Sequence, residues 1–272
     1  MIALCADVDD PRRTIEIGYD DTVDGGIPVV FLHGFPHNRS LWAPQTNALA
    51  GRARCIAPDL RGFGQSPAAP PYSMDRYADD VAALLRGLAV RRAVVAGLSM
   101  GGYVAFALWR RHRELVRALI LAGTRAGADD AAALERRRAL AEVARTEGSA
   151  AVADRMIVGM LGKRTRERSP DLVAAVREML ASSPVDGVVG ALEAMMARPD
   201  STPTLATIDV PTLVVVGDED VLAPPSEARA MHAAIAGSRL ETIEGAGHLS
   251  NYERPAAFNH VTSEFLGALA YD

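Results

Sequence analysis

The sequence predicts an α/β fold with a doubly wound, mostly parallel sheet and an inserted helical cap. Three observations support this class. Six apolar runs are continuous rather than alternating, which is typical of parallel strands buried on both faces. Helical patterns lie between these runs, and such alternation indicates a doubly wound sheet. One long segment contains no strong strand pattern, and the 272-residue length suits one α/β domain with an insertion.

The strands are predicted from runs of β-branched and small residues that lead into turn residues. The second of these strands ends at Pro58, and the others end near glycine, threonine or aspartate. The runs with their turns cover residues 27–36, 53–66, 92–102, 117–124, 211–220 and 239–248.

The helices between the strands are predicted from apolar residues spaced three and four apart. Residues 74–90 place Tyr77, Val81 and Leu84 on one face, and Ser73 is the expected N-cap. The remaining core helices are predicted at residues 103–115, 226–235 and 255–270.

Residues 125–208 interrupt the alternation. This segment is predicted to form about four helices bounded by Gly, Pro or Ser, at residues 129–148, 149–162, 169–183 and 184–199. We therefore expect a core of residues 1–124 and 209–272 and a helical cap, or lid, of residues 125–208. The Ala- and Met-rich composition of the cap predicts an apolar, adaptable pocket beneath it.

Composition argues against several classes of protein. A net charge of −5 and a pI near 5.7 predict neither a nucleic-acid nor a membrane partner. The acidic N-terminus does not resemble a signal peptide, and no apolar run reaches the roughly 18 residues of a membrane span. Cys5 and Cys55 form no metal-binding pattern and are expected to be buried free thiols. We expect a cytoplasmic protein, whose oligomeric state the sequence leaves open.

The motif with most chemical content is Gly97-Leu98-Ser99-Met100-Gly101, a G-x-S-x-G sequence between a predicted strand and a predicted helix. A sharp strand-to-helix turn brings backbone close to the serine, so glycine is needed on both sides. The N-terminus of the following helix would favour negative charge developing near the serine. The alternative interpretation is a structural turn with no reactive group.

A nucleophilic serine needs a base and an orienting acid. His248 is the preferred base because it follows the last predicted strand in a loop of small residues, whereas His112, His232 and His260 lie within predicted helices. Asp218 and Asp220 both follow the strand before it, and chemistry alone does not choose between them. The order serine, aspartate, histidine is the order found in α/β-hydrolases.

Five motifs in sequence make the chain resemble the α/β-hydrolase superfamily, in particular its small serine esterases and enol-lactone hydrolases, from about Gly18 to Leu269. The motifs are His33-Gly34-Phe35-Pro36, Asp59-Leu60-Arg61-Gly62-Phe63-Gly64-Gln65-Ser66, Gly97 to Gly101, Gly217-Asp218-Glu219-Asp220 and Gly245-Ala246-Gly247-His248.

This resemblance implies a catalytic triad of Ser99, Asp220 and His248. It also implies an oxyanion hole formed by the backbone N–H groups of Phe35 and Met100. His33, Asp59 and Ser66 are implied to shape loops rather than to react. The resemblance implies a small-molecule ester or lactone substrate and neither a metal nor an organic cofactor.

Several activities share this set of residues. Ser99 argues against epoxide hydrolases and haloalkane dehalogenases, which resemble the fold but use an aspartate nucleophile. Carbon–carbon bond hydrolases, proline iminopeptidases and cofactor-free perhydrolases remain open, because the cap and pocket determine specificity. A slow-turnover ligand receptor on the same scaffold also remains open. The sequence identifies neither the physiological substrate nor the cap residues that line the pocket.

Overall fold

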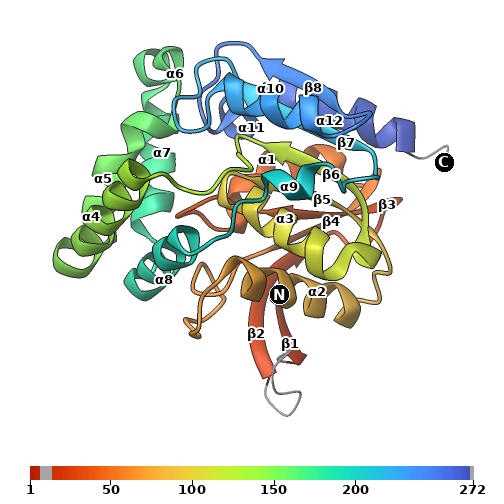
Figure 1. The fold of residues 1–272 in the computed structure, drawn as a ribbon, viewed down its shortest axis with the longest axis horizontal. Coiled ribbons are helices and arrows are strands. Elements are labelled where there is room, and N and C mark those ends of the chain that lie inside the picture. Colours follow the sequence, from red (N-terminus) through yellow and green to blue (C-terminus); the bar gives the residue numbers. More distant parts are fainter. Residues whose placement is uncertain (7–13, 270–272) are drawn as a thin grey trace.

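The computed structural model describes residues 1–6 and 14–269, which form an eight-stranded, mostly parallel sheet with helices on both faces (Figure 1). This confirms the predicted fold class. The strand order is β1-β2-β4-β3-β5-β6-β7-β8, and only the β1–β2 and β2–β4 pairs are antiparallel. The strands are β1 (Ile2–Ala6), β2 (Thr14–Asp21), β3 (Ile27–Leu32), β4 (Ala53–Pro58), β5 (Ala93–Leu98), β6 (Val116–Ala122), β7 (Thr212–Gly217) and β8 (Arg239–Ile243).

The structure has strands at all six predicted positions and adds β1 and β2. These two strands lie at one edge of the sheet, where antiparallel pairing permits one exposed face. Only three consecutive residues of β2 are buried, so these strands do not form the continuous apolar run that reveals a central strand. The hairpin they form projects from the body of the molecule (Figure 1).

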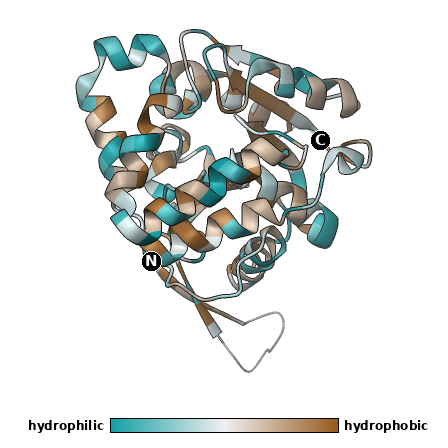
Figure 2. Ribbon diagram, turned by 60° about the vertical axis from the view of Figure 1, so that its left-hand side comes forward, coloured by the Kyte–Doolittle hydropathy of each residue, from teal (hydrophilic) through white to brown (hydrophobic). Residues whose placement is uncertain are grey.

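Successive side chains of the central strands point to opposite faces of the sheet, and both sets are buried, as in β5 and β7, where every residue is buried. In β3, Val30 and Leu32 join the hydrophobic core on one face, while Val29 and Phe31 join the core on the other. Both faces are covered, so these strands are hydrophobic throughout, and Figure 2 shows brown strand segments behind the helices.

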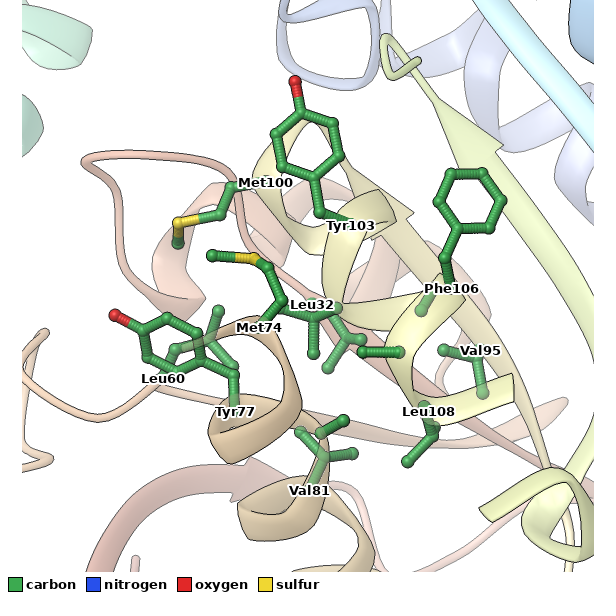
Figure 3. Close-up of a cluster of buried hydrophobic side chains, with 14 of the residues drawn as sticks. Leu32, Leu60, Met74, Tyr77, Val81, Val95, Met100, Tyr103, Phe106 and Leu108 are labelled. Carbon is green, nitrogen blue, oxygen red and sulfur yellow. The ribbon is translucent and has the colours of Figure 1, made fainter. Parts of the chain in front are cut away.

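The first face is covered by α2 (Met74–Gly87), α3 (Met100–His112) and α10 (Pro225–Ala234). Figure 3 shows Met74, Tyr77 and Val81 of α2 gathered with side chains of α3 around Leu32 and Val95. Ser73 caps α2 as predicted, because its side chain accepts a hydrogen bond from the Arg76 N–H at 3.0 Å. The helix ends at Gly87, three residues before the predicted boundary.

The second face is covered by α1 (Ala43–Leu49) and α12 (Pro255–Leu269), with the short α11 (Ser250–Glu253) beside them. Phe258 and Phe265 of α12 pack into this core together with Trp42. Trp42 lies in a 3₁₀ helix, Arg39–Trp42, and a second 3₁₀ helix, Arg113–Leu115, leads into β6.

Six helices lie between β6 and β7, and residues 125–208 contain no strand. They are α4 (Ala131–Glu147), α5 (Ser149–Met160), α6 (Lys163–Arg168), α7 (Pro170–Ala181), α8 (Val185–Met196) and α9 (Thr202–Leu205). Four of them match the predicted helices, while the short α6 and α9 were not predicted. In Figure 1 α4 to α8 gather on one side of the molecule, with α4 against α8 and α5 against α7. The division into a core and a cap stays a prediction.

Both cysteines are free and buried, on β1 and β4. Burial, with a smaller contribution from nearby carboxylates, raises the pKa of Cys5 to about 11 and that of Cys55 to about 12. Thiols with such pKa values are protonated and unreactive near neutral pH. No helix among the described residues is both long and apolar enough to span a membrane.

Candidate active site

Ser99 occupies a strained turn between β5 and α3. Its φ of 55° and ψ of −113° lie where few non-glycine residues are found. The Ser99 N–H donates to the Ala122 carbonyl at 2.9 Å, and the Thr124 hydroxyl donates to the Ser99 carbonyl at 2.8 Å. Such strain costs about 1–3 kcal/mol and persists where the surroundings fix the backbone. The end of β6 holds Ser99 in this conformation.

The glycines around Ser99 are required by close backbone contacts. A Cβ on Gly97 would lie 2.3 Å from the Gly101 carbonyl oxygen, and one on Gly101 would lie 2.1 Å from the Leu32 carbonyl oxygen. Both distances are far shorter than any real Cβ contact. The steric explanation for the G-x-S-x-G motif therefore agrees with the geometry, although the role of Ser99 stays a prediction.

His248 and Asp220 form a buried hydrogen bond. The distance from His248 Nδ1 to Asp220 Oδ2 is 2.9 Å, and each residue is 3% exposed. The other oxygen of Asp220, Oδ1, accepts from the backbone N–H groups of Leu222 and Ala223, both at 2.9 Å. Asp220 is thus fixed from one side and directed at His248 on the other.

Asp218 has a different environment. It is exposed, and its Oδ1 accepts from the backbone N–H of Ala246 at 3.2 Å. This bond holds the turn that precedes His248. The geometry therefore pairs His248 with Asp220 and gives Asp218 a contact with the loop backbone.

His33 has both ring nitrogens engaged. Its Nε2 accepts from the Leu60 N–H and its Nδ1 donates to the Gly34 carbonyl, each at 2.9 Å. The ring also meets Phe63 edge-on, with centroids 5.3 Å apart. Neither nitrogen is free to act as a base, which fits a bracing role.

Asp59 and Ser66 hold the next loop. The Asp59 carboxylate accepts from the backbone N–H groups of Arg39 and Gln65, both at 2.8 Å. The Ser66 hydroxyl donates to the Asp59 carbonyl at 2.7 Å and accepts from the Gly18 N–H at 3.0 Å. These contacts are to the protein's own backbone, and the Asp59 carboxylate also pairs with the Arg39 guanidinium, as expected of loop-shaping residues.

A cavity of about 540 Å³ brings the candidate residues together. Ser99, His248 and Phe35 line it, and Met100 begins α3 directly after Ser99. The Met100 N–H lies in the first turn of that helix, where backbone donors have no intrahelical acceptor. The predicted role of this N–H as an oxyanion donor stays a prediction.

Helices of the insertion supply the opposite wall of this cavity. Met156, Met160 and Met195 line it, as the composition of the segment suggested. Most of the lining is apolar, but the cavity is not purely apolar, because four arginines and one aspartate also line it. They are Arg125, Arg136, Arg137, Arg155 and Asp129. Composition did not reveal them, because arginines on a helical segment resemble an ordinary solvated face.

Glu253 is a site-supporting residue that the sequence analysis missed. Its Oε1 accepts from the Gly247 N–H and its Oε2 from the Gly162 N–H, both at 2.8 Å. Burial raises its pKa despite these bonds. One carboxylate thus connects the loop before His248 to the insertion. In the sequence Glu253 looks like a solvated glutamate in a short polar helix, so no signal singled it out.

We expect Glu253→Ala to lower the free energy of unfolding by about 2–4 kcal/mol, since two buried N–H groups lose their acceptor. Urea unfolding measures the change. Glu264→Ala is the matched control, because Glu264 is an exposed acid paired with Arg239 and should change stability by less than about 1 kcal/mol. Equal effects of the two substitutions would contradict the role assigned to Glu253.

Buried histidines predict acid sensitivity. Burial lowers the pKa of His33, and it lowers that of His37 to about 3. Below pH 6.5 the unfolded chain binds a proton at His37 while the folded protein, down to about pH 3, does not, and the lowered pKa of His33 acts in the same direction. Stability present above pH 6.5 is therefore lost as the pH falls, with His37 contributing about 1.4 kcal/mol per pH unit.

Urea unfolding at pH 7, 6 and 5 tests whether the free energy of unfolding falls with decreasing pH. In His37→Gln the free energy of unfolding should fall less steeply with decreasing pH than in wild type, by about 1.4 kcal/mol per pH unit. The control is His260→Gln, which changes an exposed ring and should leave the slope as it is. The same slope in wild type and His37→Gln would refute the assignment.

Comparison with known proteins shows the family. A family model described as the alpha/beta hydrolase fold matches residues 27–255, most of the chain. The chain belongs to the α/β-hydrolase family. This family membership confirms the resemblance that the five motifs indicated.

Individual relatives support ester or lactone hydrolysis. The chain is 31% identical to 3-oxoadipate enol-lactonase 2 of Acinetobacter baylyi over 239 residues, 88% of each protein. A thermophilic esterase from Thermogutta terrifontis, solved with malate bound, superposes with a TM-score of 0.95 at 39% identity, over 99% of both chains. The enol-lactonase of Burkholderia xenovorans superposes with a TM-score of 0.86 at 33% identity, over 93% of this α/β-hydrolase and 97% of that chain.

Within residues 1–6 and 14–269 of this α/β-hydrolase, no group of three or more His, Cys, Asp or Glu side chains is arranged to hold a metal ion.

Proposed function

We propose that this α/β-hydrolase is a serine hydrolase that cleaves carboxylic esters or lactones through Ser99, His248 and Asp220. The observation that carries the proposal is the buried His248–Asp220 hydrogen bond at the wall of the cavity that Ser99 also lines. A base with a fixed acid partner beside a strained, partly exposed serine is the arrangement that nucleophilic acyl transfer requires.

The first step forms an acyl-enzyme. Because Asp220 accepts from His248 Nδ1, the imidazole proton is held there and Nε2 is free to take the Ser99 proton. The Ser99 oxygen attacks the carbonyl carbon, and the backbone N–H groups of Phe35 and Met100 hold the resulting oxyanion. Protonated His248 then passes its proton to the departing alkoxide as the carbon–oxygen bond breaks.

The second step releases the acid. Water gives a proton to His248 and attacks the acyl carbon, and the same two N–H groups stabilise the second oxyanion. Collapse of this intermediate breaks the bond to Ser99, whose oxygen regains its proton from His248. Each oxyanion donor in such a site typically contributes about 10²–10³ in rate.

The insertion fits the role of a cap over this chemistry. Helices α4, α5 and α8 contribute side chains to the cavity wall opposite Ser99. We therefore propose that residues 125–208 determine which acyl and alcohol groups enter. Two buried, unpaired thiols suit a reducing compartment, and we place the protein in the cytoplasm.

The function is tested with a panel of p-nitrophenyl esters and lactones of increasing acyl length. The proposal predicts steady turnover preceded by a burst of nitrophenol close to one equivalent when deacylation is slower. Tight binding with negligible turnover would indicate a receptor. Preference for a β-diketone, for an N-terminal proline peptide or for peracid formation with hydrogen peroxide would indicate the carbon–carbon, iminopeptidase or perhydrolase alternatives.

A further inference from the structure

The cavity has a charge opposite to that of the whole chain. Its lining contains four arginines and one aspartate, whereas the protein carries a net charge of −5. Local fields of this kind concentrate ligands of the opposite charge in a low-dielectric cleft. The arginines therefore indicate which substrate chemistry the cavity favours.

The one acidic residue of the cavity is already neutralised. The Asp129 side chain is 1% exposed and pairs with both Arg137 and Arg198, the latter at 2.9 Å. Two guanidinium groups thus share one carboxylate. Asp129 has no remaining capacity to balance Arg125, Arg136 or Arg155.

Arg125 is the arginine placed beside the candidate catalytic residues. It follows Gly123, where a Cβ would lie 3.3 Å from both Asp220 Oδ2 and His248 Nδ1, and Thr124, which bonds the Ser99 carbonyl. The Arg125 Nη2 donates to the Leu222 carbonyl, which orients the guanidinium. Its Nε is buried, and no protein group in the described part of the chain accepts a hydrogen bond from it.

A buried donor on a charged group is costly to leave unpaired. An anionic oxygen satisfies such a donor best, since charge-assisted bonds from arginine are about twice as strong as neutral ones. Arg136 and Arg155 are exposed on α4 and α5 at the same cavity, and Arg155 pairs with Glu147, which is itself exposed. These two arginines suit attraction of an anion from solvent.

We propose that the substrate of this enzyme is an ester or lactone that also carries a carboxylate, and that Arg125 binds this carboxylate. The inference rests on the proposed hydrolase function and names the substrate class of the same site. Arg125 is a specificity-determining residue in this account, because it contacts the part of the substrate that does not react.

Two matched pairs of esters test the inference. The first pair places the carboxylate on the acyl group, and the second places it on the leaving group. The first pair is the mono-p-nitrophenyl ester of adipic acid and the corresponding amide-capped ester. The second pair is 4-acetoxybenzoate and 4-acetoxybenzamide. In each pair a carboxylate replaces a neutral carboxamide of similar size, and the measured quantity is the ratio of the two kcat/KM values.

We expect a ratio above about 10 for wild type in at least one pair. Arg125→Gln should lower that ratio by about 10- to 100-fold, the usual contribution of a hydrogen bond to a charged group. Arg125→Lys, which keeps the charge, should retain more of the ratio than Arg125→Gln. Arg138→Gln is the matched control, because Arg138 is exposed on the same helix as Arg136 and does not line the cavity.

The ratio cancels any general damage to the site. If Arg125 were purely structural, Arg125→Gln would lower kcat/KM equally for both esters of a pair and leave their ratio unchanged. That result would overturn the proposal. A wild-type ratio near or below one in both pairs would overturn it as well. If none of the four esters shows turnover that depends on Ser99, the hydrolase function itself fails and the substrate class fails with it.

Discussion

Ser99→Ala should lower kcat/KM for any ester substrate by about 10⁴- to 10⁶-fold, because removing the nucleophile of a serine hydrolase leaves only binding and oxyanion stabilisation. Alanine keeps the Cβ, so the positive φ of residue 99 costs about as much as before, and both backbone hydrogen bonds of that residue persist. The loss should therefore be confined to catalysis.

Steady-state kinetics and urea unfolding measure the two properties separately. Ser226→Ala is the matched control, since Ser226 is exposed at the start of α10 and should change neither activity nor stability. Ester turnover in Ser99→Ala within about tenfold of wild type would exclude Ser99 as the nucleophile.

Asp220→Asn should lower kcat by about 10⁴-fold, the effect seen when the acid of such a triad becomes an amide. Asparagine can still accept from Leu222 and Ala223 through its oxygen. Its NH₂ group would then face His248 Nδ1 and favour the tautomer with the proton on Nε2, which cannot accept the Ser99 proton. The catalytic loss should thus exceed any loss of stability.

Asp218→Asn provides the matched control for this substitution. Asp218 is exposed and its carboxylate accepts from the loop backbone of Ala246, so kcat should change by less than about threefold. Because both residues are in the same G-x-x-D segment, the pair decides which acid orients His248. Similar losses in the two variants, or a larger loss in Asp218→Asn, would contradict the assignment to Asp220.

The central sheet and the serine turn were predictable because their physical causes are local. Strands such as β3 are buried on both faces, so their sequence is continuously apolar. The turn at Ser99 needs glycine on both sides, so its residues mark it directly. β1 and β2 lack that signal because they pair antiparallel at an edge.

The contacts that the sequence did not reveal depend on residues far apart in the chain. Glu253 joins Gly162 to Gly247 through two hydrogen bonds, and nothing near it in the sequence indicates either partner. The arginines of the cavity come from separate segments of the insertion and meet only when these segments pack. Charge inside a cavity is a property of the folded arrangement, so composition alone predicted an apolar pocket.

Covalent labelling tests the central claim most directly. Incubation with a p-nitrophenyl phosphonate, followed by intact-mass measurement and peptide mapping, reports which side chain attacks an electrophile in this cavity. We expect one phosphonyl group per chain, on Ser99, with loss of ester hydrolysis in proportion to labelling and no labelling in His248→Gln. Full inactivation with the label on another residue, or full labelling of Ser99 with ester turnover intact, would contradict the account.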